Sequence, residues 1–219
     1  MSIKSCIFDM DGTLLDTIGD ITNAVNETLD SFGFEKITVN ECSSYIGSGT
    51  RALLNRAVGK ELPESEFSVI FSEYMKNYRN NLMGETTVYD GIYPLLARLS
   101  ENGILLSVCS NKPDDCVDLL VEHFFKKDNF FAAYGQRDGI PVKPNPYFAE
   151  RIIEKSGISK DDTVMIGDSA QDVMTGKNAG IKTLSVLWGY QSREKISAAG
   201  GTDFFETPYE LGDFILNGK

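Results

Sequence analysis

The sequence predicts an α/β fold, namely a Rossmann-like, doubly wound parallel sheet with an inserted all-helical cap domain. Short, nearly continuous apolar runs alternate with helical patterns over most of the 219 residues, as strands buried on both faces of a parallel sheet do. Residues 16–85 break this alternation, because they contain helical patterns alone. The predicted core is therefore residues 1–15 plus 86–219, and the predicted cap is residues 16–85.

The first element of the core is the apolar run at residues 3–8, which is too continuous for a half-exposed strand and too short for a helix. Similar runs follow the cap, and helical patterns separate them. One helical pattern opens with Pro and Asp, and another with Asn and Pro, as helix starts commonly do. The predicted later strands are 104–109, 130–134 (a weaker run), 163–166 and 183–187, and the helices between them are 113–124, 145–156 and 169–179.

The first helix of the predicted cap covers residues 18–32, where apolar side chains recur at spacings of three and four. Thr17 and Asp20 are placed to form a start resembling a capping box, and Gly33 is placed to end the helix. The same spacing recurs at residues 67–82.

Between these two cap helices, residues 47–59 (GSGTRALLNRAVG) predict a glycine-rich turn that enters a short helix. An insertion directly after the first strand lies over the carboxyl end of the sheet, where open α/β folds bind their ligands. We therefore expect a mobile lid, hinged near residues 16–18 and 84–88.

Composition excludes several classes of function. The net charge of −11 disfavours general binding to nucleic acid or to anionic lipid, and no apolar run approaches the ~20 residues that span a bilayer. The N-terminus lacks the layout of a signal peptide, and the four cysteines form no CxxC pair. The single histidine, His123, excludes a His-based triad. We expect a cytoplasmic protein that is a monomer or a weak homodimer.

Two carboxylates follow the first predicted strand. Asp9 and Asp11 are two residues apart in an extended segment, so they point the same way and share a small volume. A divalent cation on one carboxylate, or a proton on the other, would relieve their repulsion. Such a pair suits a nucleophile and a general acid/base. The alternative is a solvated acidic turn that caps the next helix.

Polar residues also follow the later strands. Ser110 and Asn111 come after the run at 104–109, where they are either ligands for an anion or a helix cap. Lys143 precedes a helix and is stiffened by two nearby prolines, so it is either a fixed charge or a surface lysine. Asp168 and Asp172 lie one helical turn apart and suit a hard cation and its support, or a plain helix start.

Together these segments, DMDGTLLDT, SNK, KPNP and GDSAQD, resemble the four motifs of the haloacid dehalogenase superfamily, the aspartate-nucleophile phosphatases. The resemblance implies that Asp9 attacks phosphorus and that Asp11 acts as acid and then base. It implies a Mg²⁺ ion held by Asp9, the Asp11 carbonyl and Asp168, with Asp172 supporting from outside. The residues that it implies for phosphate binding and orientation are Ser110, Asn111, Lys143 and Thr13.

Within the superfamily the chain most resembles phosphoglycolate phosphatases, at residues 16–29 (DTIGDITNAVNETL), at residues 47–53 and at Trp188-Gly189-Tyr190. The dehalogenases lack the second acid of the first motif, so Asp11 favours phosphoryl chemistry. Arg51 is a candidate for contacting a substrate carboxylate or second phosphate, or an exposed helix residue. The expected partner is a small phosphorylated metabolite. The remaining alternatives are a β-phosphoglucomutase-like mutase, a pyrophosphatase or nucleotidase and, outside the enzymes, an aspartate-phosphorylated receiver module.

Overall fold

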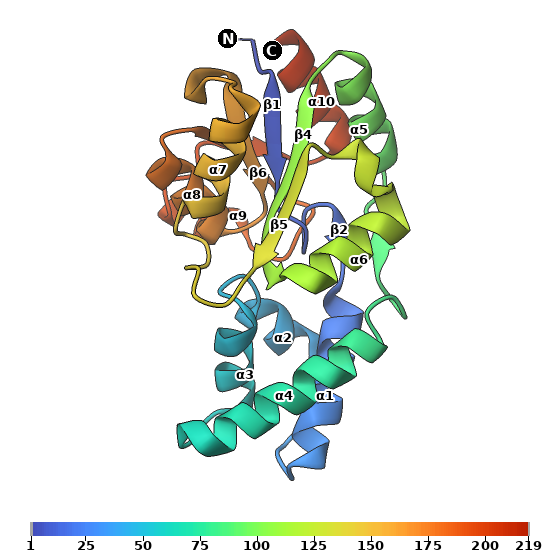
Figure 1. The fold of residues 1–219 in the computed structure, drawn as a ribbon, viewed down its shortest axis with the longest axis vertical. Coiled ribbons are helices and arrows are strands. Elements are labelled where there is room, and N and C mark those ends of the chain that lie inside the picture. The colour runs from blue at the N-terminus through green and yellow to red at the C-terminus, as the bar shows by residue number, and fades with distance from the viewer. Residues whose placement is uncertain (1, 219) are drawn as a thin grey trace.

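A six-stranded, fully parallel sheet forms the centre of the molecule (Figure 1) in the computed structural model, which describes residues 2–218. The chain starts in the middle of the sheet, builds one half outward, and then returns to build the other half. This is the strand order of a doubly wound Rossmann-like sheet, so the predicted fold class is confirmed. In spatial order the strands are β5 (Ala132–Gln136), β4 (Leu105–Pro113), β1 (Ser5–Phe8), β6 (Thr163–Gly167), β7 (Lys182–Val186) and β8 (Asp203–Phe205).

Both faces of this sheet are covered, because successive side chains of a strand point to opposite faces and the central strands contribute to two apolar clusters. The core helices are α5 (Ile92–Glu101), α6 (Asp114–Phe125), α7 (Tyr147–Ser156), α8 (Ala170–Ala179), α9 (Arg193–Ala198) and α10 (Pro208–Asn217), with short 3₁₀ turns η1 (Lys127–Asn129) and η2 (Lys160–Asp162). Cys6 and Phe8 of β1 belong to a cluster with the apolar faces of α5, α6 and α10, whereas Ile7 belongs to a second cluster with α7 and α8.

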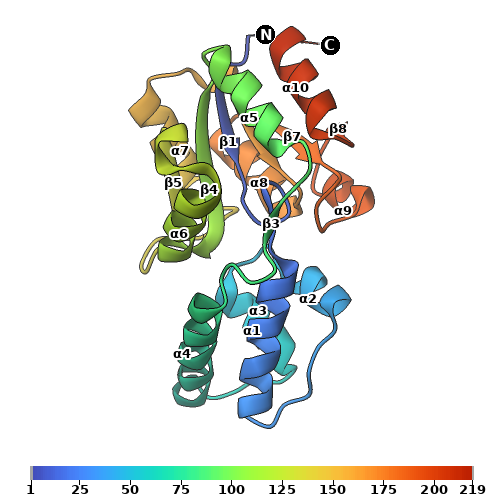
Figure 2. The same ribbon diagram turned by 90° about the vertical axis from the view of Figure 1, so that its right-hand side faces the viewer.

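Four helices form a separate bundle beyond the carboxyl ends of the strands, at the opposite end from both termini (Figures 1 and 2). The long fourth helix packs along the first, and its Tyr74 and Tyr78 rings stack at 5.6 Å between centroids. Both rings are buried, so the aromatic stripe of this helix belongs to the bundle's own core. The helices are α1 (Ile18–Ser31), α2 (Val39–Tyr45), α3 (Thr50–Val58) and α4 (Glu64–Asn80). No helix among residues 2–218 is both long and apolar enough to cross a bilayer.

The chain enters and leaves this bundle through a two-stranded antiparallel ribbon, the narrow neck in Figure 2. The outgoing strand is β2 (Leu15–Asp16) and the returning strand is β3 (Thr87–Val88). These positions overlap the segments near residues 16–18 and 84–88 that the sequence suggested as hinges, although neither strand was predicted. Two residues each are too few to produce an apolar pattern.

The predicted capping box at the start of α1 is wrong. Thr17 makes no side-chain cap there, and its hydroxyl donates instead to Asp11. The carboxylate of Asp20 is buried and accepts hydrogen bonds from the backbone N–H groups of Glu85 and Thr86, at 2.8 and 2.9 Å, and from the Thr86 hydroxyl at 2.6 Å. Asp20 therefore fastens the returning chain to the outgoing helix.

Removing the Asp20 carboxylate strands the backbone N–H donors of Glu85 and Thr86, whereas the Thr86 hydroxyl keeps the Leu82 carbonyl as an acceptor at 3.3 Å. We expect Asp20→Ala to lower the free energy of unfolding by about 2–4 kcal/mol, because unsatisfied buried donors keep their desolvation cost. Denaturant titration measures the change, and Glu27→Ala, on the exposed side of the same helix, is the matched control. A loss no larger than that of the control would show that the three hydrogen bonds contribute little.

The remaining differences are shifted ends and elements that were not predicted, namely α2, α5, α9, α10 and β8. The strand predicted at 104–109 runs on to Pro113, because Pro113 pairs with Gln136 across a register shift. The last strand, β8, has three residues and no apolar run long enough to predict it. The predicted helices at 113–124, 145–156 and 169–179 are present, each starting one or two residues later than predicted.

Candidate active site

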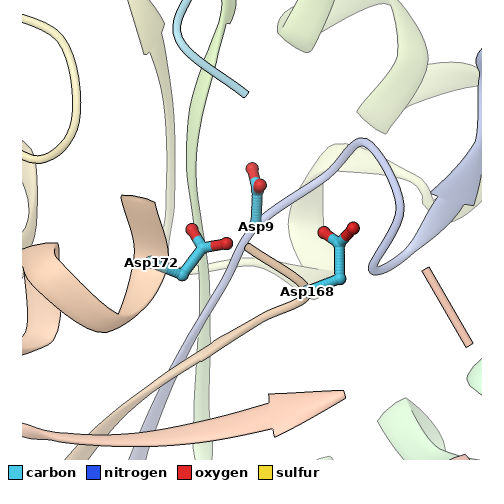
Figure 3. Close-up of side chains that lie close together, drawn as sticks. All are labelled: Asp9, Asp168 and Asp172. Carbon is cyan, nitrogen blue, oxygen red and sulfur yellow. The ribbon is translucent and has the colours of Figure 1, made fainter. Parts of the chain in front are cut away.

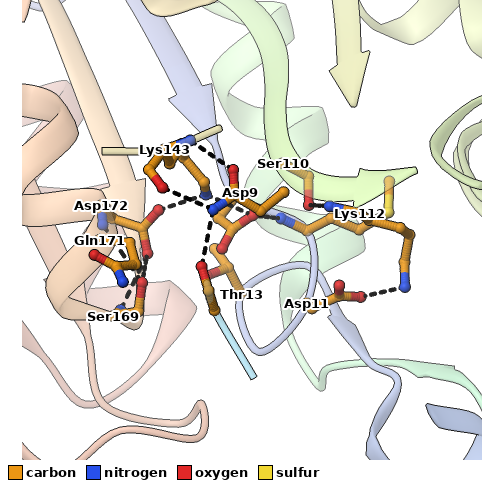
Figure 4. A network of polar contacts seen from close by, with 12 residues as sticks. Asp9, Asp11, Thr13, Ser110, Lys112, Lys143, Ser169, Gln171 and Asp172 are labelled. Atoms are coloured by element: carbon orange, nitrogen blue, oxygen red, sulfur yellow. Dashed lines mark hydrogen bonds and ion pairs between the residues drawn. The ribbon is translucent and has the colours of Figure 1, made fainter. Parts of the chain in front are cut away.

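Asp9 stands directly after β1, where its side chain is buried and paired with a lysine from another loop. The Nζ atom of Lys143 lies 2.9 Å from Asp9 and 2.6 Å from Asp172, so one ammonium bridges two carboxylates (Figure 4). Lys143 is itself buried, so it is the fixed charge and not the surface lysine of the two readings. The Asn111 side chain holds the Lys143 backbone in this position. It accepts a hydrogen bond from the Lys143 N–H and donates one to the Lys143 carbonyl.

Asp9, Asp168 and Asp172 converge on one point (Figure 3), and a carboxylate oxygen from each lies within 4.8 Å of the others. The turn after β1 allows this approach because Gly12 has a positive φ of 81° and no side chain. A Cβ at Gly12 would lie 2.4 Å from an oxygen of Asp168, so any other residue would push that carboxylate away.

Burial disfavours charge on this cluster. It raises the pKa of Asp9 to about 7, against the opposing effect of Lys143. It also raises the pKa of Asp168 to about 8, and the neighbouring Asp172 and Asp9 carboxylates add to the effect. Although burial opposes it, the charges of Asp172 and Asp9 raise the pKa of Lys143 above its usual value. Oxygen donors that carry more negative charge than one lysine balances fit a hard divalent cation.

These pKa shifts predict how the metal-free protein responds to pH. Folded Asp9 and Asp168 hold protons up to about pH 7 and 8, whereas their unfolded forms release them near pH 4. The folded state therefore binds more protons across this window, and the free energy of unfolding falls as pH rises through it. We expect the melting temperature in EDTA to fall between about pH 5 and about pH 8. Added Mg²⁺ should raise the melting temperature more at the higher pH than at the lower.

Scanning calorimetry at both pH values, with and without Mg²⁺, checks this expectation. Asp168→Asn is the informative variant, because an amide carries no titrating proton and should flatten the slope. A melting temperature that rises across the window in EDTA would contradict it.

The side chain of Asp11 turns away from the acid cluster. It accepts a hydrogen bond from Thr17 at 2.8 Å and pairs with Lys112 Nζ at 2.8 Å (Figure 4). Its carboxylate therefore faces the helical bundle, while that of Asp9 faces the cluster. The expectation that the two acids point the same way and share a small volume is therefore wrong, because their carboxylates have separate partners.

The other predicted site residues are nearby but differ in what their side chains contact. Ser110 is buried and lines the cavity described below, so its hydroxyl is placed for an anion. The side-chain amide of Asn111 forms hydrogen bonds within the protein, because it donates to the backbone carbonyls of Gly47 and Lys143. Thr13 donates to Asp168 at 3.1 Å. Asn111 and Thr13 therefore hold the Lys143 loop and a carboxylate in place.

A cavity lies between these residues and the helical bundle, with about 600 Å³ of empty space including the part open to solvent. Its floor is polar and carries Asp9, Asp11 and Ser110, and its roof includes Leu53 and Tyr74 from the bundle. Two hydrogen bonds close one side, since Asn111 donates to the Gly47 carbonyl and Gln171 donates to the Ser48 hydroxyl.

Arg51 is not brought to this cavity. It lies on α3, half exposed, where it pairs with Glu64 and stands 4.6 Å above the Phe67 ring. The cavity lining does not include it. In this arrangement of the bundle Arg51 therefore fits the exposed helix residue of the two readings.

Two residues at this site have no role that their sequence positions predict. Lys112 is buried against Asp11, and only its place beside Ser110 could have singled it out. The hydroxyl of Tyr190 accepts from the Thr17 N–H and donates to Asp16, while its backbone N–H donates to Asp168 at 2.7 Å. Tyr190 thus links the acid cluster to the ribbon that joins the bundle to the core.

The fold and the site together are typical of one class of protein, and a comparison of the sequence with known families identifies that class. A doubly wound sheet that presents Asp9, Ser110, Lys143 and Asp168 at one edge agrees with a sequence profile of the haloacid dehalogenase-like hydrolases, which matches residues 6–186. The chain belongs to this family. The resemblance read from its motifs is confirmed.

Individual relatives agree with this assignment. A phosphoglycolate phosphatase of Agrobacterium fabrum is 33% identical over 84% of this chain and 80% of its own length, and one of Psychrobacter arcticus is 33% identical over 99% and 97%. A solved structure from Lactobacillus delbrueckii subsp. bulgaricus, provisionally named phosphoglycolate phosphatase, has a TM-score of 0.92 at 30% identity, covering 99% of this chain and all of that one. The expectation of an enzyme of this family, close to its phosphatases, is confirmed.

Proposed function

We propose that the protein is a Mg²⁺-dependent phosphatase that hydrolyses a small phosphomonoester, of which phosphoglycolate is the first candidate, through an aspartyl phosphate on Asp9. One observation carries the proposal. Asp9 is a buried carboxylate bridged to Asp172 by the Lys143 ammonium, while Asp11, two residues later, faces the cavity from another side. The names of the curated relatives support the choice of substrate.

In the first half-reaction an Asp9 oxygen attacks phosphorus, the bond from phosphorus to the ester oxygen breaks, and Asp11 gives its proton to the departing alcohol. Ser110 donates to a phosphoryl oxygen, and the Lys143 ammonium attracts the phosphoryl group electrostatically. A Mg²⁺ ion, which Asp9 and Asp168 would hold, would supply further neutralisation of the charge on the phosphoryl oxygens. In the second half-reaction Asp11 takes a proton from water, which attacks the aspartyl phosphate and frees Asp9.

In this scheme the helical bundle is the cap, which comprises residues 16–85. Its apolar side chains exclude bulk water from the cavity and hold the alcohol part of the substrate against Asp11. The contacts at Gly47 and Ser48 are few and polar, so they can break and reform as substrate enters.

Release of phosphate from p-nitrophenyl phosphate and from a set of small phosphomonoesters tests the proposal. Activity should vanish with EDTA and return when Mg²⁺ is added, because the acid cluster otherwise holds protons. Full activity in EDTA, with no metal found by elemental analysis, would overturn the metal requirement. No hydrolysis of any phosphomonoester would overturn the function.

Hydrolysis is distinguished from mutase chemistry by the fate of the phosphoryl group. Incubation with β-glucose 1-phosphate and a trace of the 1,6-bisphosphate should give little glucose 6-phosphate. Rapid glucose 6-phosphate formation with little free phosphate would replace the phosphatase by a mutase.

A further inference from the structure

Lys112 is a buried lysine that the proposed chemistry does not use. Its side chain is 2% exposed, and its Nζ lies 2.8 Å from Asp11 and contacts the Tyr78 hydroxyl. The same ammonium stands 4.7 Å from the centre of the Tyr78 ring. Removing an ammonium from water is costly unless it is paired, so such a residue calls for an explanation.

The charges that line the cavity give Lys112 a distinct position. The lining includes three aspartates but one lysine and no arginine, and that lysine is Lys112. Lys143 lies behind Asp9, where it is bridged to Asp172. An anionic group on the alcohol part of a substrate would therefore meet Lys112 as the one cation in the cavity wall.

The position of Lys112 beside Asp11 suits the binding of such an anionic group. Asp11 is the residue proposed to protonate the ester oxygen, and Lys112 contacts the same carboxylate. The ammonium therefore stands beside the place of the ester oxygen, within reach of a carboxylate one carbon away. An ammonium has three N–H donors, and Asp11 and Tyr78 are its two recorded partners among residues 2–218, which leaves one donor for a ligand.

We propose that Lys112 is the specificity-determining cation of the site, held in place by Tyr78 and binding a carboxylate on the carbon next to the ester oxygen. The substrates are then phosphomonoesters of small 2-hydroxy carboxylic acids. This inference rests on the proposed phosphatase function. It assigns to Lys112, on the floor of the cavity, the role that the sequence suggested for Arg51 on the cap.

Steady-state kinetics of the Mg²⁺-loaded enzyme with two matched substrates test the inference. One is 2-phosphoglycolate, and the other is 2-hydroxyethyl phosphate, in which a neutral hydroxymethyl group replaces the carboxylate. Lys112→Met should raise KM for 2-phosphoglycolate about 10- to 100-fold more than for 2-hydroxyethyl phosphate, because only the first loses a charge-assisted hydrogen bond. Lys112→Arg should retain part of the preference.

Two further variants control the experiment. Arg51→Met should leave the ratio of the two kcat/KM values unchanged. Tyr78→Phe removes the hydroxyl that holds the ammonium, so it should shift the same ratio in the same direction by a smaller factor. This variant keeps the ring and serves if Lys112→Met does not fold.

The other outcomes separate the possible failures. An equal loss of kcat/KM for both substrates in Lys112→Met would show that Lys112 only positions Asp11, and would overturn the inference. A changed ratio in Arg51→Met alone would move the role to the cap. A wild-type enzyme that hydrolyses phosphomonoesters without preferring the carboxylate would overturn the inference but not the function. A wild-type enzyme that hydrolyses none would overturn both.

Discussion

Asp9→Asn should abolish phosphate release, by about 10⁴-fold or more, because the attacking oxygen is replaced by an amide that forms no acyl phosphate. The fold should persist. An asparagine is the same size, and its carbonyl oxygen can still accept the hydrogen bond that Asp9 takes from the Met10 N–H at 2.7 Å. A neutral side chain should even raise the melting temperature at about pH 8 in EDTA, since burial disfavours the charged carboxylate.

Phosphate release, mass spectrometry of the intact protein and the melting temperature check this expectation together. Asp30→Asn is the matched control, because that carboxylate is exposed and far from the site. Wild-type turnover by Asp9→Asn would refute the nucleophile. If the variant lost both turnover and its fold, Asp9 would be a structural residue. The melting temperature distinguishes this outcome from the loss of turnover in a folded protein.

Lys143→Met should damage both activity and stability. The ammonium neutralises Asp9 and Asp172 at once, and Asp172 is fully buried. Removing one member of a buried ion pair costs about 3–5 kcal/mol, because the carboxylates left behind have no partner. We expect a loss of this size in the free energy of unfolding at about pH 8, and a smaller loss at about pH 5, where Asp9, with its pKa raised to about 7 by burial, holds a proton.

The same variant should lower kcat/KM by about 10³-fold, as removal of a group that stabilises charge in the transition state does. Denaturant titration at both pH values and steady-state kinetics measure the two effects. Lys4→Met is the control, since Lys4 forms an exposed pair with Asp162 that contributes at most about 1 kcal/mol. Equal stability loss at the two pH values would show that packing, and not charge, is what Lys143 supplies.

The sheet could be predicted wherever a strand is buried on both faces. The runs that became β1, β4, β6 and β7 are apolar because helices cover both sides of them. Short strands could not be predicted in this way. β8 is three residues long, and β2 and β3 have two each, so their pairing depends on what the rest of the chain brings beside them.

Within the site, residues that act next to their own strand were predictable, and those that act across the chain were not. Asp9 and Asp168 follow strands whose carboxyl ends meet, so topology alone brings them together. Lys112 acquires its surroundings from Tyr78, which lies 34 residues earlier on a helix of the bundle. Asp20 looks like a helix cap in the sequence, but its carboxylate is taken by the returning chain at Thr86.

The ribbon of β2 and β3 has a consequence for how such enzymes diversify. Because Asp16 pairs with Thr87, the two points where the chain enters and leaves the helical bundle are about 5 Å apart, the spacing of antiparallel neighbours. A gene segment encoding residues 17–86 can therefore be exchanged as a cassette, since the recipient needs only two adjacent ends. The strands that pair with β1, and Asp9 directly after it, lie outside this cassette. Recombination can thus supply new substrate chambers to an unchanged reaction centre.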